Sequence, residues 1–295
     1  MASLATSLDP RDLRVLEGLR LMPRKSFGGR VRGERLTSKK GISIEFADYR
    51  EYTDGDDLRH LDWNVLARLN VPVTKTYRDE EDLAVHVLLD TSPSMQFGDP
   101  SKLECAKKYA CALGLLGLVG GDAVYPRALS ARERPMPALR GRSSFHRLAM
   151  WTDQLRENSE NPIGLSASLR QFAGASARAG LVVLISDGLD PDAGTAVRIV
   201  GGRGHEVLFL QILSREELDP DLEGDLRLID GEGGTPAEIT ANSSVLNEYR
   251  QRLEAHNSEI RDAVLRVGGR YALIRPDEPF DYVLSHTFKR QRWVG

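Results

Sequence analysis

Three oxygen-bearing side chains stand at alternate positions in the segment Asp90-Thr91-Ser92-Pro93-Ser94. A carboxylate and two hydroxyls with this spacing can turn to one side of a tight loop. They are hard oxygen ligands and suit Mg²⁺ or Mn²⁺, which take octahedral oxygen coordination and usually keep several waters. The structural alternative is that Asp90 and Ser92 cap the following helix and form hydrogen bonds within the loop, without a metal.

A further carboxylate, Asp187, stands in the segment 186–190, Ser-Asp-Gly-Leu-Asp. This segment and the Asp90 segment each follow directly on an apolar run, 181–185 and 83–89 respectively. Ligands of open parallel sheets bind beyond the carboxyl ends of the strands, so both segments are expected at one binding edge. Two carboxylates there would repel each other, and a cation between them removes the repulsion. The predicted metal ligands are Asp90, Ser92, Ser94 and Asp187.

The elements that must position these residues alternate regularly from residue 81 onward. We predict strands over 83–89, 123–129, 181–185, 207–213 and 271–274, and helices over 103–119, 143–155, 165–177, 242–267 and from about 280. Strands that are apolar throughout are typical of a sheet with helices on both faces. The pattern therefore predicts a doubly wound, mainly parallel, Rossmann-like α/β fold over residues 81–295.

Residues 1–80 are predicted to form an N-terminal extension of short strands and loops after a first helix, 10–21. A basic arm, residues 21–40, carries seven lysines and arginines against one glutamate. It is either a solvated flexible arm or a segment that binds phosphate or an acidic partner. Short strands are expected over 42–46 and 71–77, the second at a sheet edge because it contains Pro72.

Residues 45–64 form an acidic and aromatic run, Glu-Phe-Ala-Asp-Tyr-Arg-Glu-Tyr-Thr-Asp-Gly-Asp-Asp-Leu-Arg-His-Leu-Asp-Trp-Asn. In a structural interpretation, Asp56 or Asp57 caps a short helix, the tryptophan packs against the sheet, and the arginines pair with carboxylates. In a functional interpretation the run binds a partner, because aromatic and arginine residues are favoured at interfaces. The candidate partner-binding residues are Arg50, Asp56, Asp57, Arg59 and Trp63.

The composition excludes several classes of function. A net charge of −3 and a pI of about 6.1 give no overall attraction to nucleic acid or anionic membrane. No apolar stretch approaches the roughly 20 residues that span a bilayer, and the first residues do not resemble a signal peptide. The two cysteines, Cys105 and Cys111, point in different directions on one predicted helix and form no disulfide framework. We expect a cytoplasmic protein with no membrane insertion and no nucleic-acid partner.

At the Asp90 and Asp187 segments the chain resembles the von Willebrand factor A fold, whose metal-ion-dependent adhesion site combines Asp-x-Ser-x-Ser with a threonine and an aspartate from two other loops. The run 45–64 resembles the bacterial domain-of-unknown-function family 58, in which such a run precedes an A-like domain. That resemblance covers about residue 26 to the C-terminus, and it implies a MoxR-type AAA+ ATPase as partner in chaperone-like assembly.

The chain departs from the family pattern in the second loop. Relatives usually have Gly-Thr-Asp-Leu before a helix, whereas this chain has Pro162-Ile163-Gly164-Leu165. Ile163 cannot ligate a cation in place of the threonine, although Ser166 or Ser168 is close enough in the sequence to supply an oxygen. The resemblance therefore implies a degenerate site whose affinity for Mg²⁺ or Mn²⁺ is reduced.

Catalytic motifs other than the two carboxylates are absent from the sequence. The six histidines are scattered, Ser92 lacks the glycines of a nucleophile elbow, and there is no Walker A loop. We predict a non-catalytic protein-interaction module in which a partner's carboxylate completes the metal coordination. The alternative is a Mg²⁺-dependent phosphoesterase that uses Asp90 and Asp187.

Overall fold

A computed structural model of the protein describes residues 8–25, 27, 45–53, 61–78, 82–129, 136–157, 163–175, 178–228 and 237–295, with side chains except at 45–48, 75–78 and 228. The chain divides into two compact units, one made of Met1–Arg24 with Leu83–Gly295 and the other of Lys25–Asp82. The sequence-based division at residue 80 differs at the N-terminus. The backbone N–H of Arg20 donates to the carbonyl of Gly295 (2.9 Å), and helix α1 (Pro10–Leu16) belongs to the larger unit.

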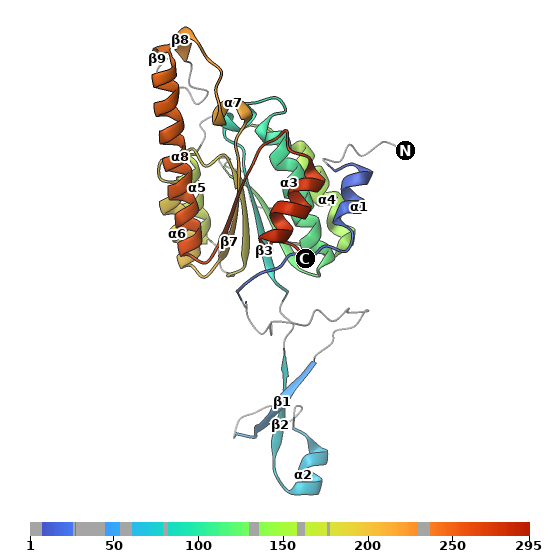
Figure 1. Ribbon diagram of the computed structural model, residues 1–295. Helices are drawn as coiled ribbons and strands as arrows, with labels where there is room; N and C mark the ends of the chain where they lie inside the picture. Colours follow the sequence, from blue (N-terminus) through green and yellow to red (C-terminus); the bar gives the residue numbers. More distant parts are fainter. Residues whose placement is uncertain are drawn as a thin grey trace. The chain divides into compact units, whose positions relative to one another are not determined.

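The larger unit is built on one six-stranded sheet (Figure 1). Its strands, in spatial order, are β10 (Arg270–Ile274), β7 (Glu206–Ile212), β6 (Leu181–Ser186), β3 (Ala84–Asp90), β4 (Ala123–Leu129) and β5 (Leu139–Arg140). All neighbours are parallel except the short edge strand β5, which runs antiparallel to β4. Strands β3, β6 and β7 are buried along their whole length, which explains their largely apolar sequences.

Helices cover both faces of this sheet (Figure 1). One face carries α5 (Leu165–Ala175), α6 (Ala193–Gly202) and α8 (Ser243–Arg266), and the other carries α3 (Lys102–Val119), α4 (Phe145–Gln154), α1, α9 (Phe280–Tyr282) and the π-helical turn η4 (Val283–Phe288). The fold is therefore mixed α/β with a mainly parallel central sheet, consistent with the predicted Rossmann-like class. None of the helices in the described part of the chain is both long and apolar enough to cross a membrane.

Several elements were not predicted. They are the 3₁₀ turns η2 (Pro93–Gln96) and η3 (Arg142–Ser144), the edge strand β5, helices α6 and α7 (Arg215–Leu218), and the hairpin β8 (Gly224–Leu228) with β9 (Ala237–Ala241). Helix α7 follows β7 directly and lies at the carboxyl end of the sheet (Figure 1). It therefore brings a third chain segment to the edge at which the Asp90 and Asp187 loops are expected.

The smaller unit contains the antiparallel pair β1 (Glu45–Glu51) and β2 (Val73–Arg78) and helix α2 (Trp63–Leu69). Two structural predictions for it are wrong. Asp62 caps α2 by accepting hydrogen bonds from the backbone N–H groups of Asn64 and Val65, so the cap is neither Asp56 nor Asp57. Trp63 is 60% exposed and does not pack into a core, because it begins a helix in which no residue is buried.

The structure describes two of the predicted partner-binding residues, Arg50 and Trp63. Arg50 donates a hydrogen bond to the Thr53 hydroxyl at 3.4 Å, and both Arg50 and Trp63 are exposed. Asp56, Asp57, Arg59 and most of the basic arm lie outside the described residues. The partner-binding role of this run stays a prediction.

Candidate functional site

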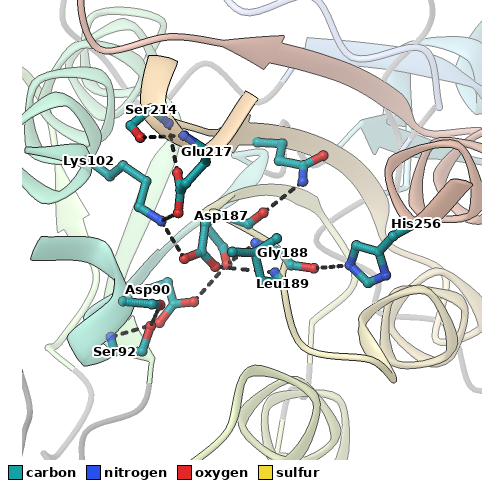
Figure 2. A network of polar contacts seen from close by, with 12 residues as sticks. Asp90, Ser92, Lys102, Asp187, Gly188, Leu189, Ser214, Glu217 and His256 are labelled. Atoms are coloured by element: carbon teal, nitrogen blue, oxygen red, sulfur yellow. Dashed lines mark hydrogen bonds and ion pairs between the residues drawn. The ribbon is translucent and has the colours of Figure 1, made fainter. Parts of the chain in front are cut away.

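The Asp90 and Asp187 loops meet at the carboxyl edge of the sheet (Figure 2). Asp90 is the last residue of β3, and Asp187 follows the last residue of β6. These strands are hydrogen-bonded neighbours in parallel register, with Leu89 opposite Ile185, so they end at the same level. The hydroxyl of Ser186 donates to Oδ2 of Asp90 at 2.7 Å and ties the two strand ends together.

Asp90 is a buried carboxylate with only 1% of its surface exposed. Its Oδ1 accepts a hydrogen bond from the backbone N–H of Ser92 at 2.9 Å, so loop hydrogen bonding, one part of the structural alternative, is present. Burial raises the pKa of Asp90, and the negative charge of Asp187 raises it further, against the opposing effect of the hydrogen bonds from Ser186 and Ser92. The surroundings of Asp90 therefore disfavour the ionised form of its side chain.

The two loop serines lie with their hydroxyls together. The Oγ atoms of Ser92 and Ser94 are 3.0 Å apart, and although Ser92 is the residue before the 3₁₀ turn η2, its side chain makes no capping bond. Two ligands at adjacent corners of an octahedron around Mg²⁺, each about 2.1 Å from the ion, would lie about 3 Å apart. The spacing of these hydroxyls thus suits two adjacent ligands as well as a hydrogen bond between them.

A buried lysine contacts the second carboxylate. The Nζ atom of Lys102 lies 2.8 Å from Oδ2 of Asp187 and 2.5 Å from Oε1 of Glu217, and its side chain is 0% exposed (Figure 2). Lys102 is the first residue of α3, directly after the N-cap Ser101. A local signal for it exists in the sequence, because a lysine at the positive end of a helix is electrostatically unfavourable and calls for a reason.

Glu217 is held toward this site by a capping box at the start of α7. Ser214 accepts a hydrogen bond from the backbone N–H of Glu217 at 3.2 Å, and Glu217 Oε2 accepts one from the backbone N–H of Ser214 at 2.7 Å. One carboxylate oxygen thus fixes the helix and the other faces Lys102. The Ser-x-x-Glu pattern that marks a capping box was the available sequence signal for this residue.

Side chains from strand β7 and helix α8 hold the backbone of the Asp187 loop in place. The side-chain N–H of Gln211 donates to the carbonyl oxygen of Asp187 at 2.7 Å, and Nε2 of His256 lies 2.8 Å from the carbonyl oxygen of Gly188 (Figure 2). Gly188 has a φ of +68°, a conformation that glycine adopts without strain. The loop is therefore held by neighbouring strands and helices, as a preorganised binding edge requires.

Comparison with known proteins identifies the family. A model of the family described as "Protein of unknown function DUF58" matches residues 48–259 of the chain. The chain belongs to this family. Uncharacterized proteins of Mycobacterium tuberculosis and Mycobacterium bovis are 27% identical to it over 277 residues, which cover 91% of this chain and 86% of theirs.

Solved structures resemble this DUF58 chain only at a coarse level. A conserved hypothetical protein BatB from Bacteroides thetaiotaomicron has a TM-score of 0.47 with 18% sequence identity, covering 71% of this chain and 98% of that one. An aerotolerance-related membrane protein from Bacteroides fragilis has a TM-score of 0.45 with 16% identity, and it covers the same shares.

In the described part of the second loop, from Ile163 onward, the two serines considered as oxygen donors are engaged in other hydrogen bonds. The hydroxyl of Ser166 donates to Oδ1 of Asp190 at 2.6 Å, and that of Ser168 donates to the backbone carbonyl of Ile163 at 3.4 Å. Burial opposes the ionisation of Asp190, but the hydrogen bonds from Ser166 outweigh it and keep the pKa of Asp190 below its ordinary value. Both serines are thus engaged within the loops that flank α5.

The donors at the edge fit a divalent cation in part. Asp90, Ser92 and Ser94 are oxygen donors of the kind that Mg²⁺ takes, whereas Asp187 is ion-paired with Lys102. Within the described ranges, no three side chains of the His, Cys, Asp and Glu types gather closely enough to hold a metal by themselves. Among the described residues at this edge, Asp90 is therefore a carboxylate without a bridging lysine, and Ser92 and Ser94 add two hydroxyls.

Proposed function

We propose that this DUF58 protein is a non-catalytic interaction module with a von Willebrand factor A-like domain, and that it binds a partner at the Asp90 edge. The observation that carries the proposal is the convergence of Asp90, Ser92 and Ser94 at the carboxyl end of a buried parallel sheet, next to the Asp187 loop. This is where open α/β sheets bind their ligands.

Mg²⁺ is the proposed cofactor of this edge. Asp90, Ser92 and Ser94 would hold it, and a carboxylate of the partner would complete its coordination. The requirement for an outside carboxylate is consistent with the ion pair between Asp187 and Lys102 at the described edge. A module of this kind needs the ion only to join two proteins and needs no catalytic base.

The proposed partner is a MoxR-type AAA+ ATPase, which the protein would assist in chaperone-like assembly. The basis is the resemblance of the run 45–64 to proteins that work beside such ATPases. The exposed Trp63 and Arg50 of that run offer a second contact surface.

The competing proposal of a Mg²⁺-dependent phosphoesterase has less support. It requires Asp90 and Asp187 to share a catalytic cation. The Asp187 carboxylate is instead 2.8 Å from the Lys102 ammonium, with which it forms a buried ion pair. We therefore favour the binding module.

A pull-down of the full chain with a MoxR-type AAA+ ATPase of the same organism tests the proposal. The double variant Ser92→Ala/Ser94→Ala should weaken capture at least about tenfold, as expected for loss of two ligands. The matched control Ser143→Ala/Ser244→Ala removes two exposed hydroxyls away from the edge and should bind normally. Undiminished capture of the Ser92→Ala/Ser94→Ala protein would reject the Asp90 edge as the binding site. Loss that occurs in this variant, but not with EDTA on the unaltered chain, would keep the edge and reject the cation.

A further inference from the structure

A buried ammonium group already stands among the carboxylates of the edge. Lys102 Nζ contacts Asp187 and Glu217 from within, and no part of the lysine side chain reaches solvent. We infer that Lys102 is a built-in cation that keeps the edge assembled without a divalent metal and lowers the affinity of the edge for one. The inference concerns how the proposed binding site is regulated, and its biological meaning rests on that proposed function.

The first argument is the charge of the site. Asp90 and Asp187 stand at neighbouring strand ends, Glu217 of α7 faces Asp187 across the Lys102 ammonium, and Asp90 is close enough to Asp187 for its pKa to respond to that charge. Uncompensated like charges in a dry site repel each other strongly. The Lys102 ammonium bridges two of them, because its nitrogen lies within 2.8 Å of one and 2.5 Å of the other. It therefore supplies the attraction that a metal ion would otherwise have to supply.

The second argument is where the lysine stands. It is the first residue of α3, where the helix dipole disfavours a positive charge, and burial of an ammonium group is costly by itself. Its side chain also gives up its rotamer freedom. A lysine is held in such a place only because the two carboxylates offset these costs. The position of Lys102 is therefore explained by its contacts with Asp187 and Glu217 and not by the stability of helix α3.

Lys107 of the same helix shows the contrast. Its Nζ lies 2.7 Å from Glu104, a glutamate three residues earlier whose side chain is 66% exposed. That pair is local and its acid is solvated, so it joins no other element. Lys102 instead joins α3 to the loop after β6 and to α7, partners that lie 85 and 115 residues away in the sequence.

The consequence concerns the ligands left for a metal. While Lys102 holds Asp187 and Glu217, a divalent cation meets only Asp90 and two neutral hydroxyls from this chain, and such a set binds Mg²⁺ weakly. Without the ammonium, Asp187 and Glu217 would both face the point that its nitrogen occupies. A neutral residue at position 102 should therefore turn the edge into a divalent cation site.

The experiment compares Lys102→Met with the matched control Lys107→Met in the full chain. Thermal unfolding is followed in EDTA and with Mg²⁺ or Mn²⁺, and Mn²⁺ binding is measured by calorimetry. The unaltered protein should melt at the same temperature in EDTA and in Mn²⁺. The Lys102→Met protein should melt lower in EDTA, recover with Mn²⁺, and bind Mn²⁺ at least about tenfold more tightly than the unaltered chain. The Lys107→Met protein should show no such recovery.

A second variant covers the case in which Lys102→Met does not fold. Lys102→Met/Asp187→Asn removes both charges of the principal pair, which is less disruptive than leaving one buried charge alone. It should fold in EDTA and gain nothing from Mn²⁺, because one of the two bridging carboxylates is gone.

Three results would overturn the inference. They are a rise in the melting temperature of the unaltered protein with Mn²⁺, an equal Mn²⁺ affinity of the Lys102→Met protein and the unaltered chain, and Mn²⁺ rescue of Lys107→Met as well. The test is separate from that of the proposed function. The Lys102 result is read from cation binding without a partner, whereas the proposed function is read from capture by Ser92→Ala/Ser94→Ala.

Discussion

At the residue scale, Asp90 is a site at which the proposed binding role and the stability of the fold make opposite demands. It is 1% exposed, and burial and the neighbouring Asp187 both raise its pKa. A raised pKa means that the folded protein holds the Asp90 proton more tightly than the unfolded chain does. This contribution favours folding below the unfolded pKa and is lost as the pH rises through the folded pKa. Above its folded pKa the charged Asp90 therefore destabilises the fold.

Asp90→Asn should accordingly stabilise the protein. At pH 7 we expect the free energy of unfolding to rise, because the neutral amide does not carry the charge that burial and Asp187 disfavour. The gain should shrink as the pH falls, because Asp90 becomes protonated at a higher pH than an ordinary aspartate does. Urea unfolding at pH 7 and at lower pH values measures it, with the exposed Asp221→Asn as a control that should change little. A loss of stability at pH 7 would show that the hydrogen bonds from Ser92 and Ser186 outweigh the cost of the charge.

The sequence predicts those residues of the site that stand within one loop or directly after an apolar strand. Asp90, Ser92 and Ser94 stand in one loop, and Asp187 follows an apolar strand that has to lie beside the first one. Lys102 and Glu217 were missed because their roles depend on contacts over 85 and 115 residues. Their local signals, a lysine at the first helical position and a capping box, indicate helix starts but do not indicate that the two side chains meet.

At the scale of elements, helix α3 packs closely against strand β4 of the sheet. A Cβ added at Gly117 would lie 2.9 Å from Cγ2 of Val124, a branched side chain in β4. Gly174 lies in α5 and is the opposite case, since a Cβ there would meet nothing within 4 Å. The same substitution at these two helical glycines should therefore have opposite effects.

Gly117→Ala should lower the free energy of unfolding by about 1–3 kcal/mol, because an extra methyl in a well-packed core forces displacements. Gly174→Ala should raise it by up to about 1 kcal/mol, because alanine has the higher helix propensity and no contact is disturbed. Chemical unfolding of the two single variants measures both values. Equal effects would show that α3 can move away from β4 without cost.

The predicted bounds of helices and strands agree best with the structure for buried elements, whose sequences are mainly apolar. Residues 123–129 are β4 as predicted, and Leu103–Val119 differs from α3 by one residue at its start. Helix α6 was missed because three glycines in ten residues weaken its helical pattern. The β8–β9 hairpin was missed because most of its described residues are exposed, so no apolar alternation marks its strands.

At the scale of the whole molecule, the carboxyl edge of the sheet is polar. A cluster of rings that includes His86 and His205 lies in the core. His86 in β3 is 7% exposed, stacks on Tyr125, and contacts Phe172 and His205 edge-on. Its Nε2 lies 3.2 Å from the carbonyl oxygen of Arg178. Burial is the main cause that lowers the pKa of His86 to about 4, so the ring is neutral in the folded protein at physiological pH.

This histidine predicts how the whole domain responds to acid. Its folded pKa lies below the unfolded value of 6.5, so its contribution to stability is fully present above pH 6.5 and is lost as the pH falls toward about 4. We expect that loss to reach about 2–3 kcal/mol. His86→Gln keeps a donor for the Arg178 carbonyl but cannot be protonated in this range. Its stability should therefore be lower at pH 7, where ring stacking is lost, and flatter between pH 6.5 and 4.5. Urea unfolding across this range measures both slopes, and the exposed His146→Gln should keep the steep one. An equally steep loss in His86→Gln would assign the acid sensitivity to other groups.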